Sequence, residues 1–411
     1  MKSASSAVVA TSCLQAAKRP GSLPIYCMSL GGFAIGTEGF MIAPLLPDIA
    51  DDLVLSLSSA AMLVTAFTLT LAISSPILTV MTAAVNRRNL LVGAMTAFAA
   101  ANIVAWRSAG FSGIMVARVL LALSAGLYLP NANALVGSIV APEKRGWALA
   151  VVVGGMTIAI ALGLPLGAVV GHAFGWRWTF FGVGVLAGVA AIGLFWGIPR
   201  AAGEGVAVPG FRERIRVAGQ PRILRALSVT LFWAMGAFTA YPFIATYLHA
   251  TLGFDSPGVS AVVFLWGVSA AAGLIVGGSL NDRLGSRFVI APALGLLATA
   301  FLILGASATF LSADQAVVPV VVAVVVWGAS VWGFHPAQMA HLIGIGGAAA
   351  APIALSLNTS ILYIGFGLGS GLGAAIIARY SVADIGFAAA AIEAIGLLFF
   401  AANRLIEKVG R

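Results

Sequence analysis

Twelve apolar runs, each long enough to cross a lipid bilayer, constrain this chain more than any other feature of its sequence. A membrane-spanning helix needs about 20 largely apolar residues. Only 9% of the residues are charged, against roughly 25% in soluble globular chains, and the mean hydropathy is +1.05. The pattern predicts an all-α membrane protein with twelve transmembrane helices, at about residues 23–46, 58–82, 90–106, 111–139, 147–171, 178–198, 223–249, 258–280, 288–311, 316–343, 351–378 and 385–403.

Basic residues are concentrated on one side of this predicted arrangement. With the N-terminus placed in the cytoplasm, 18 of the 22 Lys and Arg residues fall in inward segments, and Arg107, Arg177 and Arg379 fall in outward loops. Such a bias is typical of membrane proteins, whose cytoplasmic loops carry the excess of Lys and Arg. We therefore expect both termini in the cytoplasm, and we attribute the net charge of +9 to topology rather than to nucleic-acid binding. The outward side receives Asp48, Asp51, Asp52, Asp255, Asp314 and Asp384.

The longest polar segment, Pro199–Pro221, divides the apolar runs into two sets of six. Segment Met81–Arg88, after the second run, aligns with Leu280–Arg287, after the eighth. Parallel six-helix repeats with a substrate site between them are a known transporter plan. We expect a cytoplasmic N-terminal tail at 1–22, a six-helix bundle at 23–198, an amphipathic cytoplasmic linker at 199–222, a second six-helix bundle at 223–404 and a cytoplasmic C-terminal tail at 405–411.

The most specific motif is Gly278-Ser-Leu-Asn-Asp-Arg-Leu-Gly-Ser-Arg287. Its glycines permit a tight turn that presents one carboxylate and two cations near helix ends. The string resembles the loop signature of the major facilitator superfamily. The resemblance implies a cytoplasmic gate formed by Asp282, Arg283 and Arg287, together with Arg87 and Arg88 of the first half. That first-half loop departs from the signature, with Ala83, Ala84 and Asn86 at its aspartate, arginine and glycine positions, so we expect a weaker gate there.

Four further stretches resemble the drug:proton antiporter branch of this superfamily, which includes bacterial chloramphenicol and sugar exporters. They are Gly32–Ala50, Ala117–Gly126, Met156–Ala168 with Phe174–Arg177, and Leu355–Ser360. The resemblance implies a major facilitator fold in a bacterial cytoplasmic (inner) membrane, acting as a monomer without a cofactor. Its implied partners are a small-molecule substrate, protons and the lipid bilayer.

The fifth predicted helix carries a stripe of small residues. Gly155, Ala159, Gly163, Gly167 and Gly171 recur every four residues, and Pro165 predicts a kink. Helices in lipid associate through close backbone approach, so the stripe indicates a surface for packing and sliding. Gly365, Gly369 and Gly373 repeat the pattern in the eleventh helix.

Three strongly ionisable residues lie well inside predicted spans: Glu38, Arg118 and Glu393. A charged side chain at the bilayer centre costs at least about 2.5–3.5 kcal/mol, so such residues usually have a function. Glu38 and Arg118 lie at similar predicted depths, and we interpret them as the proton-coupling pair; a purely structural ion pair is the alternative. Glu393 and the histidines His335 and His341 are weaker candidates for proton transfer, with structural roles as the alternative.

Uncharged polar side chains on the predicted helices are candidates for the substrate cavity, or alternatively for hydrogen bonds between helices. They are Tyr128, Asn131, Asn133, Tyr241, Gln338, Asn358 and Tyr363. The resemblance implies a secondary active transporter that exports drug-like amphipathic compounds or sugars by proton antiport; an uncoupled facilitator or an importer is the alternative. The sequence contains no Ser/His/Asp set, no spacing typical of metal ligands and no phosphate-binding loop, so we expect no enzyme activity.

Overall fold

The computed structural model describes residues 22–140, 142–200, 202 and 210–409. The predicted N-terminal tail before Ser22, much of the predicted linker, and residues 410–411 lie outside this range. Twelve helices in the described part are long and apolar enough to cross a membrane. The sequence-based prediction of an all-α membrane protein with twelve spanning helices is therefore confirmed.

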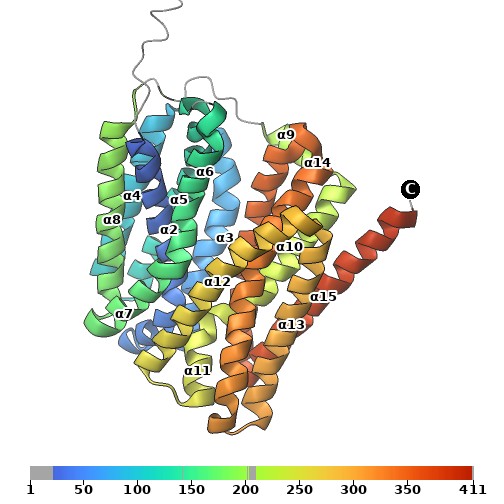
Figure 1. Ribbon diagram of the computed structural model, residues 1–411. Coiled ribbons are helices and arrows are strands. Elements are labelled where there is room, and N and C mark those ends of the chain that lie inside the picture. The colour runs from blue at the N-terminus through green and yellow to red at the C-terminus, as the bar shows by residue number, and fades with distance from the viewer. Residues whose placement is uncertain (1–21, 141, 201, 203–209, 410–411) are drawn as a thin grey trace, which may run out of the picture.

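The first six spans form one bundle, drawn from blue to green in Figure 1. Four of them are the helices α2, α3, α4 and α5, and the sixth is α8. The fifth consists of α6, a π-helical turn and α7. Their bounds are α2 Leu23–Asp52, α3 Leu57–Met81, α4 Arg87–Arg107, α5 Phe111–Ile139, α6 Arg145–Ile158, the π turn Ala159–Gly163, α7 Leu164–Phe174 and α8 Trp176–Gly197.

The last six spans form a second bundle beside the first, drawn from yellow-green to red in Figure 1. The short helix α9, Phe211–Ala218, precedes it. The seventh span combines α10, a 3-10 turn and α11, and α14 contains both the tenth and the eleventh. The bounds are α10 Pro221–Ala240, the 3-10 turn Tyr241–Phe243, α11 Ile244–Leu252, α12 Ser256–Leu284, α13 Arg287–Phe310, α14 Ala313–Arg379 and α15 Val382–Val409.

The two ends of the spans differ in charge. We call one end the arginine-rich end, defined by Arg87, Arg145, Arg222, Arg287 and Arg404, and the other the acidic end, defined by Asp52, Asp255, Asp314 and Asp384. By the positive-inside rule the arginine-rich end is the one predicted to face the cytoplasm.

The connection between the tenth and eleventh spans differs from the sequence-based expectation. The predicted apolar runs at 316–343 and 351–378 leave a connection over 344–350, whereas the tenth span runs on to Gly347 and the eleventh begins at Ala350. Gly347 has a φ of 63° inside otherwise continuous helical structure. Glycine adopts this left-handed conformation without steric cost, so a single residue turns the chain where a loop is predicted.

The first helix also extends beyond its predicted end near residue 46 and continues to Asp52. The reason is a set of contacts at the acidic end. Arg177 Nη1 and Trp176 Nε1, at the start of α8, donate to Asp52 Oδ2 at 2.5 and 3.3 Å. These bonds hold the last turn of α2 against α8.

The degenerate first-half loop has a local structural role. The Asn86 side chain accepts hydrogen bonds from the backbone N–H groups of Arg88 and Asn89, at 3.0 and 3.4 Å, and so caps the start of α4. Asparagine is among the best N-cap residues because its oxygen satisfies N–H groups that lack a partner within the helix. The residue that replaces the signature glycine therefore stabilises the helix that follows.

The predicted kink near Pro165 takes the form of the π turn Ala159–Gly163. Proline lacks the N–H that the helical ladder needs, and one wide turn accommodates the mismatch. A comparable break occurs in the seventh span, where Tyr241–Phe243 forms a 3-10 turn around Pro242. Both breaks lie near the middle of their spans, where the two bundles meet.

Candidate functional site

Glu38 of α2 and Arg118 of α5 form an ion pair inside the first bundle, in which Arg118 Nη1 donates to Glu38 Oε1. Both side chains have no exposed surface. Arg118 Nε also donates to the backbone oxygen of Leu63 at 3.1 Å, and its guanidinium carbon lies 4.2 Å from the ring centre of Phe67. The pair is therefore held by α2, α3 and α5 together.

The hydrogen bonding of this pair is incomplete. Glu38 Oε2 and Arg118 Nη2 are buried without a hydrogen-bond partner among the described residues. A buried ion pair offsets its desolvation cost only when its remaining polar atoms are also satisfied. The arrangement is thus less stable than a fully bonded pair.

Aromatic side chains fill the space between the two bundles near mid-span. Phe40 of α2 contacts three rings of the second bundle, with ring centres 5.8 Å from Tyr241, 5.8 Å from Trp332 and 6.3 Å from Phe238. The Tyr241 hydroxyl donates to the backbone oxygen of Phe40 at 3.0 Å. These contacts join the bundles through apolar and aromatic surface.

Two small cavities lie within this aromatic cluster, each of about 10 Å³, which is about the room needed by one water molecule. The first is lined by Phe40, Trp233, Ala237, Phe238, Tyr241, Trp266, Trp327, Val331, Trp332 and Phe366. The second is lined by Ile35, Gly36, Gly39, Phe40, Phe67, Thr68, Met156, Phe238, Tyr363 and Phe366. A larger ligand would fit here only after these side chains move apart.

Three indole N–H groups in the first cavity lack hydrogen-bond partners. They belong to Trp233, Trp266 and Trp327, which are buried and have no partner for Nε1 among the described residues. Buried donors are normally satisfied, so an unsatisfied set around one cavity indicates a place where a ligand oxygen could bind. Sequence reasoning missed these residues because tryptophan in an apolar run has no signal that separates packing from binding.

Two of the seven sequence-predicted cavity residues, Tyr241 and Tyr363, line these cavities. Three others belong to the first bundle away from them. Tyr128 donates to the backbone oxygen of Met28 at 3.1 Å, Asn131 accepts from Arg87 at 2.5 Å, and Asn133 is exposed.

The remaining two cavity candidates bond within the second bundle. Gln338 Nε2 donates to Thr230 Oγ1 at 2.9 Å and to the backbone oxygen of Ala226 at 2.7 Å, while Thr230 Oγ1 donates to Asn358 Oδ1 at 2.7 Å. This chain of bonds joins α10 to both spans of α14. It corresponds to the alternative role, hydrogen bonding between helices.

The predicted gate residues divide into two groups. Arg87 and Arg88 are buried in the first bundle, where Arg87 bonds to Asn131 and Arg88 donates to the backbone oxygen of Phe195 at 2.5 Å. Asp282, Arg283 and Arg287 are exposed at the arginine-rich end. Asp282 forms no ion pair with a cation among the described residues, so the predicted gate role is not supported by such a contact here.

The glycine stripe of the fifth span packs against α2. A Cβ atom added at Gly155, Gly163, Gly167 or Gly171 would overlap Ser29, Thr37, Met41 or Leu45, respectively. The stripe of the eleventh span packs on α10 in the same way, through Gly365, Gly369 and Gly373. Both stripes therefore hold helices together within one bundle. Thr37 directly precedes Glu38, so the contact at Gly163 lies one residue from the ion pair along α2.

Glu393 of α15 is fully buried against Gly236 of α10. Neither of its carboxyl oxygens has a hydrogen bond of standard geometry among the described residues. His335 stacks on Trp332 with ring centres 5.8 Å apart, next to the aromatic cluster, and His341 lies near Phe400 at the arginine-rich end. These three residues do not contact the Glu38–Arg118 pair in any interaction of the described residues.

Contacts between the bundles extend from mid-span to the acidic end. His172 Nδ1 of α7 lies 3.1 Å from Ser260 Oγ of α12, and His172 Nε2 lies 3.4 Å from Asp48 Oδ2. Ser370 of α14 donates to the backbone oxygen of Ala61 at 3.4 Å. Figure 1 shows α12 crossing obliquely toward α7 at this end. The described contacts thus close the acidic end around the central cavities.

Comparisons with known proteins agree with this architecture. The family model for the Major Facilitator Superfamily matches residues 28–370. An inner membrane transport protein of Escherichia coli K12, YdhP, is 28% identical over 94% of this chain and 97% of its own. A chloramphenicol resistance protein of Streptomyces lividans is 33% identical over 64% of this chain and 67% of its own.

Among solved structures, a bacterial homologue of the human lysosomal transporter Spinster superposes with a TM-score of 0.75. The match covers 92% of this chain and 96% of that chain at 16% sequence identity, so it bears on the fold alone.

Proposed function

The chain belongs to the major facilitator superfamily, and we propose that it exports small, neutral, amphipathic molecules in exchange for protons. It is a multi-pass membrane transporter rather than an enzyme. The observation that carries the proposal is the buried Glu38–Arg118 pair beside an aromatic cavity between the two bundles.

The first step of the proposal is that Glu38 carries the proton. A carboxyl group can accept a proton in this apolar site, whereas a guanidinium stays charged. Protonation removes the attraction that holds Arg118, and Arg118 in turn lies over Phe67, which lines one central cavity. A change of charge at Glu38 thereby reaches the substrate cavity through two side-chain contacts.

The second step concerns the substrate. The described side chains that line the two central cavities carry no charge, and three indole N–H donors there are unsatisfied. Aromatic walls favour flat or apolar ligand surface, and the donors favour carbonyl, ether or hydroxyl oxygens. These features support a neutral drug-like molecule with hydrogen-bond acceptors, consistent with the similarity to a chloramphenicol resistance protein. Sugars, which need many donors and acceptors, fit this lining less well.

The third step is alternating access. We propose that the bundles at 23–198 and 223–404 rock as units around the central aromatic cluster. The contacts that close the acidic end support access from the arginine-rich end in this conformation. With the predicted cytoplasmic orientation of that end, both termini face the cytoplasm of a bacterial inner membrane, and substrate enters from inside. We propose that one chain suffices for this cycle, because both bundles belong to one polypeptide.

Transport in proteoliposomes with an imposed pH gradient tests the proposal. A panel of fluorescent neutral aromatic compounds identifies a substrate, and uptake is then measured with and without the gradient. We expect the wild type to concentrate substrate only with the gradient. Glu38→Gln should abolish this concentration while it retains substrate binding, because its side chain carries no titratable proton.

Asp384→Asn is the matched control, since this half-buried acid at the acidic end accepts a hydrogen bond from Ser381 at the start of α15. It should transport like the wild type. Accumulation by Glu38→Gln against a substrate gradient would refute the role of Glu38. Equal transport by the wild type with and without the pH gradient would instead favour the uncoupled facilitator.

A further inference from the structure

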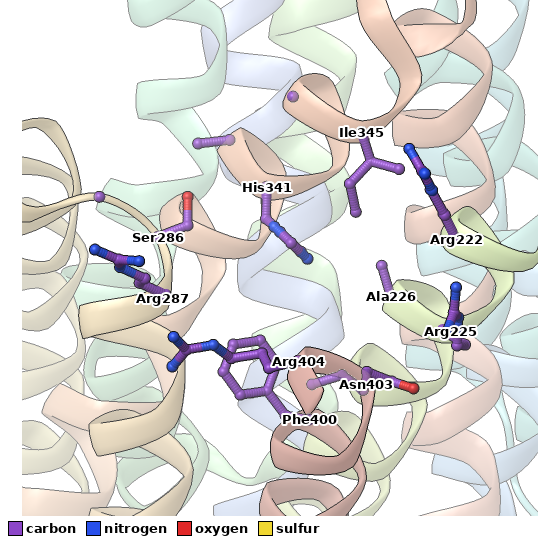
Figure 2. Close-up of a pocket in the computed structure, with 14 residues that line it drawn as sticks. Arg222, Arg225, Ala226, Ser286, Arg287, His341, Ile345, Phe400, Asn403 and Arg404 are labelled. Carbon is purple, nitrogen blue, oxygen red and sulfur yellow. The ribbon is translucent and has the colours of Figure 1, made fainter. Parts of the chain in front are cut away.

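A cavity of about 490 Å³ opens at the arginine-rich end of the second bundle, away from the central aromatic cluster (Figure 2). Its walls come from the start of α10, the α12–α13 turn, the middle of α14 and the end of α15. Figure 2 shows Arg222 and Arg225 on one side of the cavity, Arg287 and Arg404 on the other, and His341 between them.

The lining of this cavity is strongly cationic. It contains four arginines and no acidic residue among the described side chains. None of the four forms an ion pair with a described carboxylate. Guanidinium groups around one space repel each other, and a bound anion would offset that repulsion. Arginine also matches phosphate in geometry, since its planar fork donates two parallel hydrogen bonds.

The rest of the lining is apolar. Phe400 is 5% exposed, and Ala226, Val229 and Ile345 complete the wall toward the membrane-spanning part of the helices. Arg222 and Arg287 stand within two residues of the helix starts, where a spanning segment meets the headgroup layer. The cavity therefore offers cations at headgroup depth and apolar surface below them.

We propose that this cavity binds the phosphate group of an amphiphile, and that the ligand is an anionic phospholipid of the surrounding leaflet. Basic pockets between spanning helices on the cytoplasmic side are known sites for such headgroups. The bound phosphate would bridge α10, α13 and α15, and so fix the arginine-rich end of the second bundle. This site is separate from the proposed proton and substrate sites, and its test does not depend on transport.

The test measures binding of fluorescent phosphatidylglycerol to the full chain in neutral detergent micelles. Arg225→Gln with Arg404→Gln removes one cation from each side of the cavity. Each basic residue near an anionic lipid contributes about fivefold to affinity, so the double variant should bind about 25-fold more weakly. Arg145→Gln with Arg216→Gln is the control. Both residues are exposed and lie outside the cavity, and this pair lowers the net charge by the same amount as the cavity pair.

The control pair should bind within about twofold of the wild type. An equal loss in both variants would mean that the basic surface acts without a specific site, and no loss in either would also overturn the proposal. Phosphatidylcholine should compete poorly, since its headgroup has no net charge. Competition by glycerol 3-phosphate at the same concentration as the lipid would assign the phosphate site to a soluble ligand instead.

A second measurement covers the case in which the double variant does not fold. Binding of phosphatidylglycerol to the unmodified protein should weaken by at least tenfold between 50 mM and 500 mM salt, since screening acts on charge contacts at the protein surface. The charge-preserving pair Arg225→Lys with Arg404→Lys should bind more tightly than the glutamine pair and more weakly than the wild type, because lysine keeps the charge but lacks the planar fork. Salt-independent binding would show that acyl-chain contacts alone hold the lipid, and the cationic site would be rejected.

Discussion

Removing Glu38 should destabilise the protein more than removing its partner Arg118. Glu38→Gln leaves the Arg118 guanidinium charged, buried and without its carboxylate, and this group does not deprotonate in proteins. Arg118→Leu leaves a carboxylate that can take a proton from solvent and become neutral. Removing one partner of a buried pair typically costs about 3–5 kcal/mol of stability. We expect Glu38→Gln to fall in that range and Arg118→Leu to cost less.

The two single variants should also differ in how their free energy of unfolding changes with pH. In Arg118→Leu the folded state is favoured by proton uptake at Glu38, so its stability relative to the wild type should increase as the pH falls from 8 to 5. Glu38→Gln has no such group and should show a constant loss over the same range. The double variant Glu38→Gln with Arg118→Leu should cost less than Glu38→Gln alone, because it leaves no buried charge.

The assay is reversible unfolding in mixed micelles of dodecylmaltoside and SDS, followed by tryptophan fluorescence. The free energy of unfolding is compared with that of the wild type at each pH, so that effects of pH on the detergent cancel. Equal losses from the two single variants, or a loss in Arg118→Leu that does not change with pH, would refute the reasoning. Such a result would mean that water reaches the pair and screens it.

Three further predictions concern the other parts of the site. Gly163→Leu should insert into the membrane normally but reduce transport at least tenfold, because the leucine side chain would overlap α2 next to the ion pair. The control is Gly154→Leu, whose side chain would point into open space and which should transport normally in the same uptake assay. Asp282→Asn should slow transport more than Ala83→Asp changes it, and equal uptake rates in both variants would contradict this. The free energy of unfolding of Asp282→Asn should stay within about 0.5 kcal/mol of the wild-type value, since Asp282 is exposed and forms no ion pair with described residues. Trp327→Phe should weaken binding of an acceptor-bearing substrate by about fivefold through loss of one hydrogen bond and leave an analogue without the acceptor unaffected, as equilibrium binding would show.

Much of the architecture was predictable from residue types alone. Unpaired backbone N–H and C=O groups are costly in a bilayer, so a sufficiently long apolar run forms a spanning helix, which pairs these groups within itself. Basic loop residues favour one side of the membrane by a similarly simple rule. Glu38, Arg118 and Glu393 were identifiable for the same reason, since strong charges in apolar runs are rare and costly.

Which residues each polar side chain contacts, and how deeply it is buried, depends by contrast on how the helices pack. Helix rotation decides whether Tyr128 faces the cavity or the backbone of Met28, and an isolated span carries no signal for that rotation. The aromatic cavity illustrates the same limit. Trp233, Trp266 and Trp327 come from three different spans, and only their convergence makes three unsatisfied donors into a candidate binding site.

The sequence by itself determined that this protein lies in a lipid bilayer, how many spanning helices it has and to which family it belongs. These conclusions rest on hydropathy, the length of the apolar runs and the loop motif, which are local properties of the chain. The tertiary structure decided that Glu38 meets Arg118, that the glycine stripes hold each bundle together, and that four arginines from α10, α13 and α15 surround one cavity. These contacts join residues far apart in sequence, and their energies depend on distance, burial and direction, which only the packed helices define.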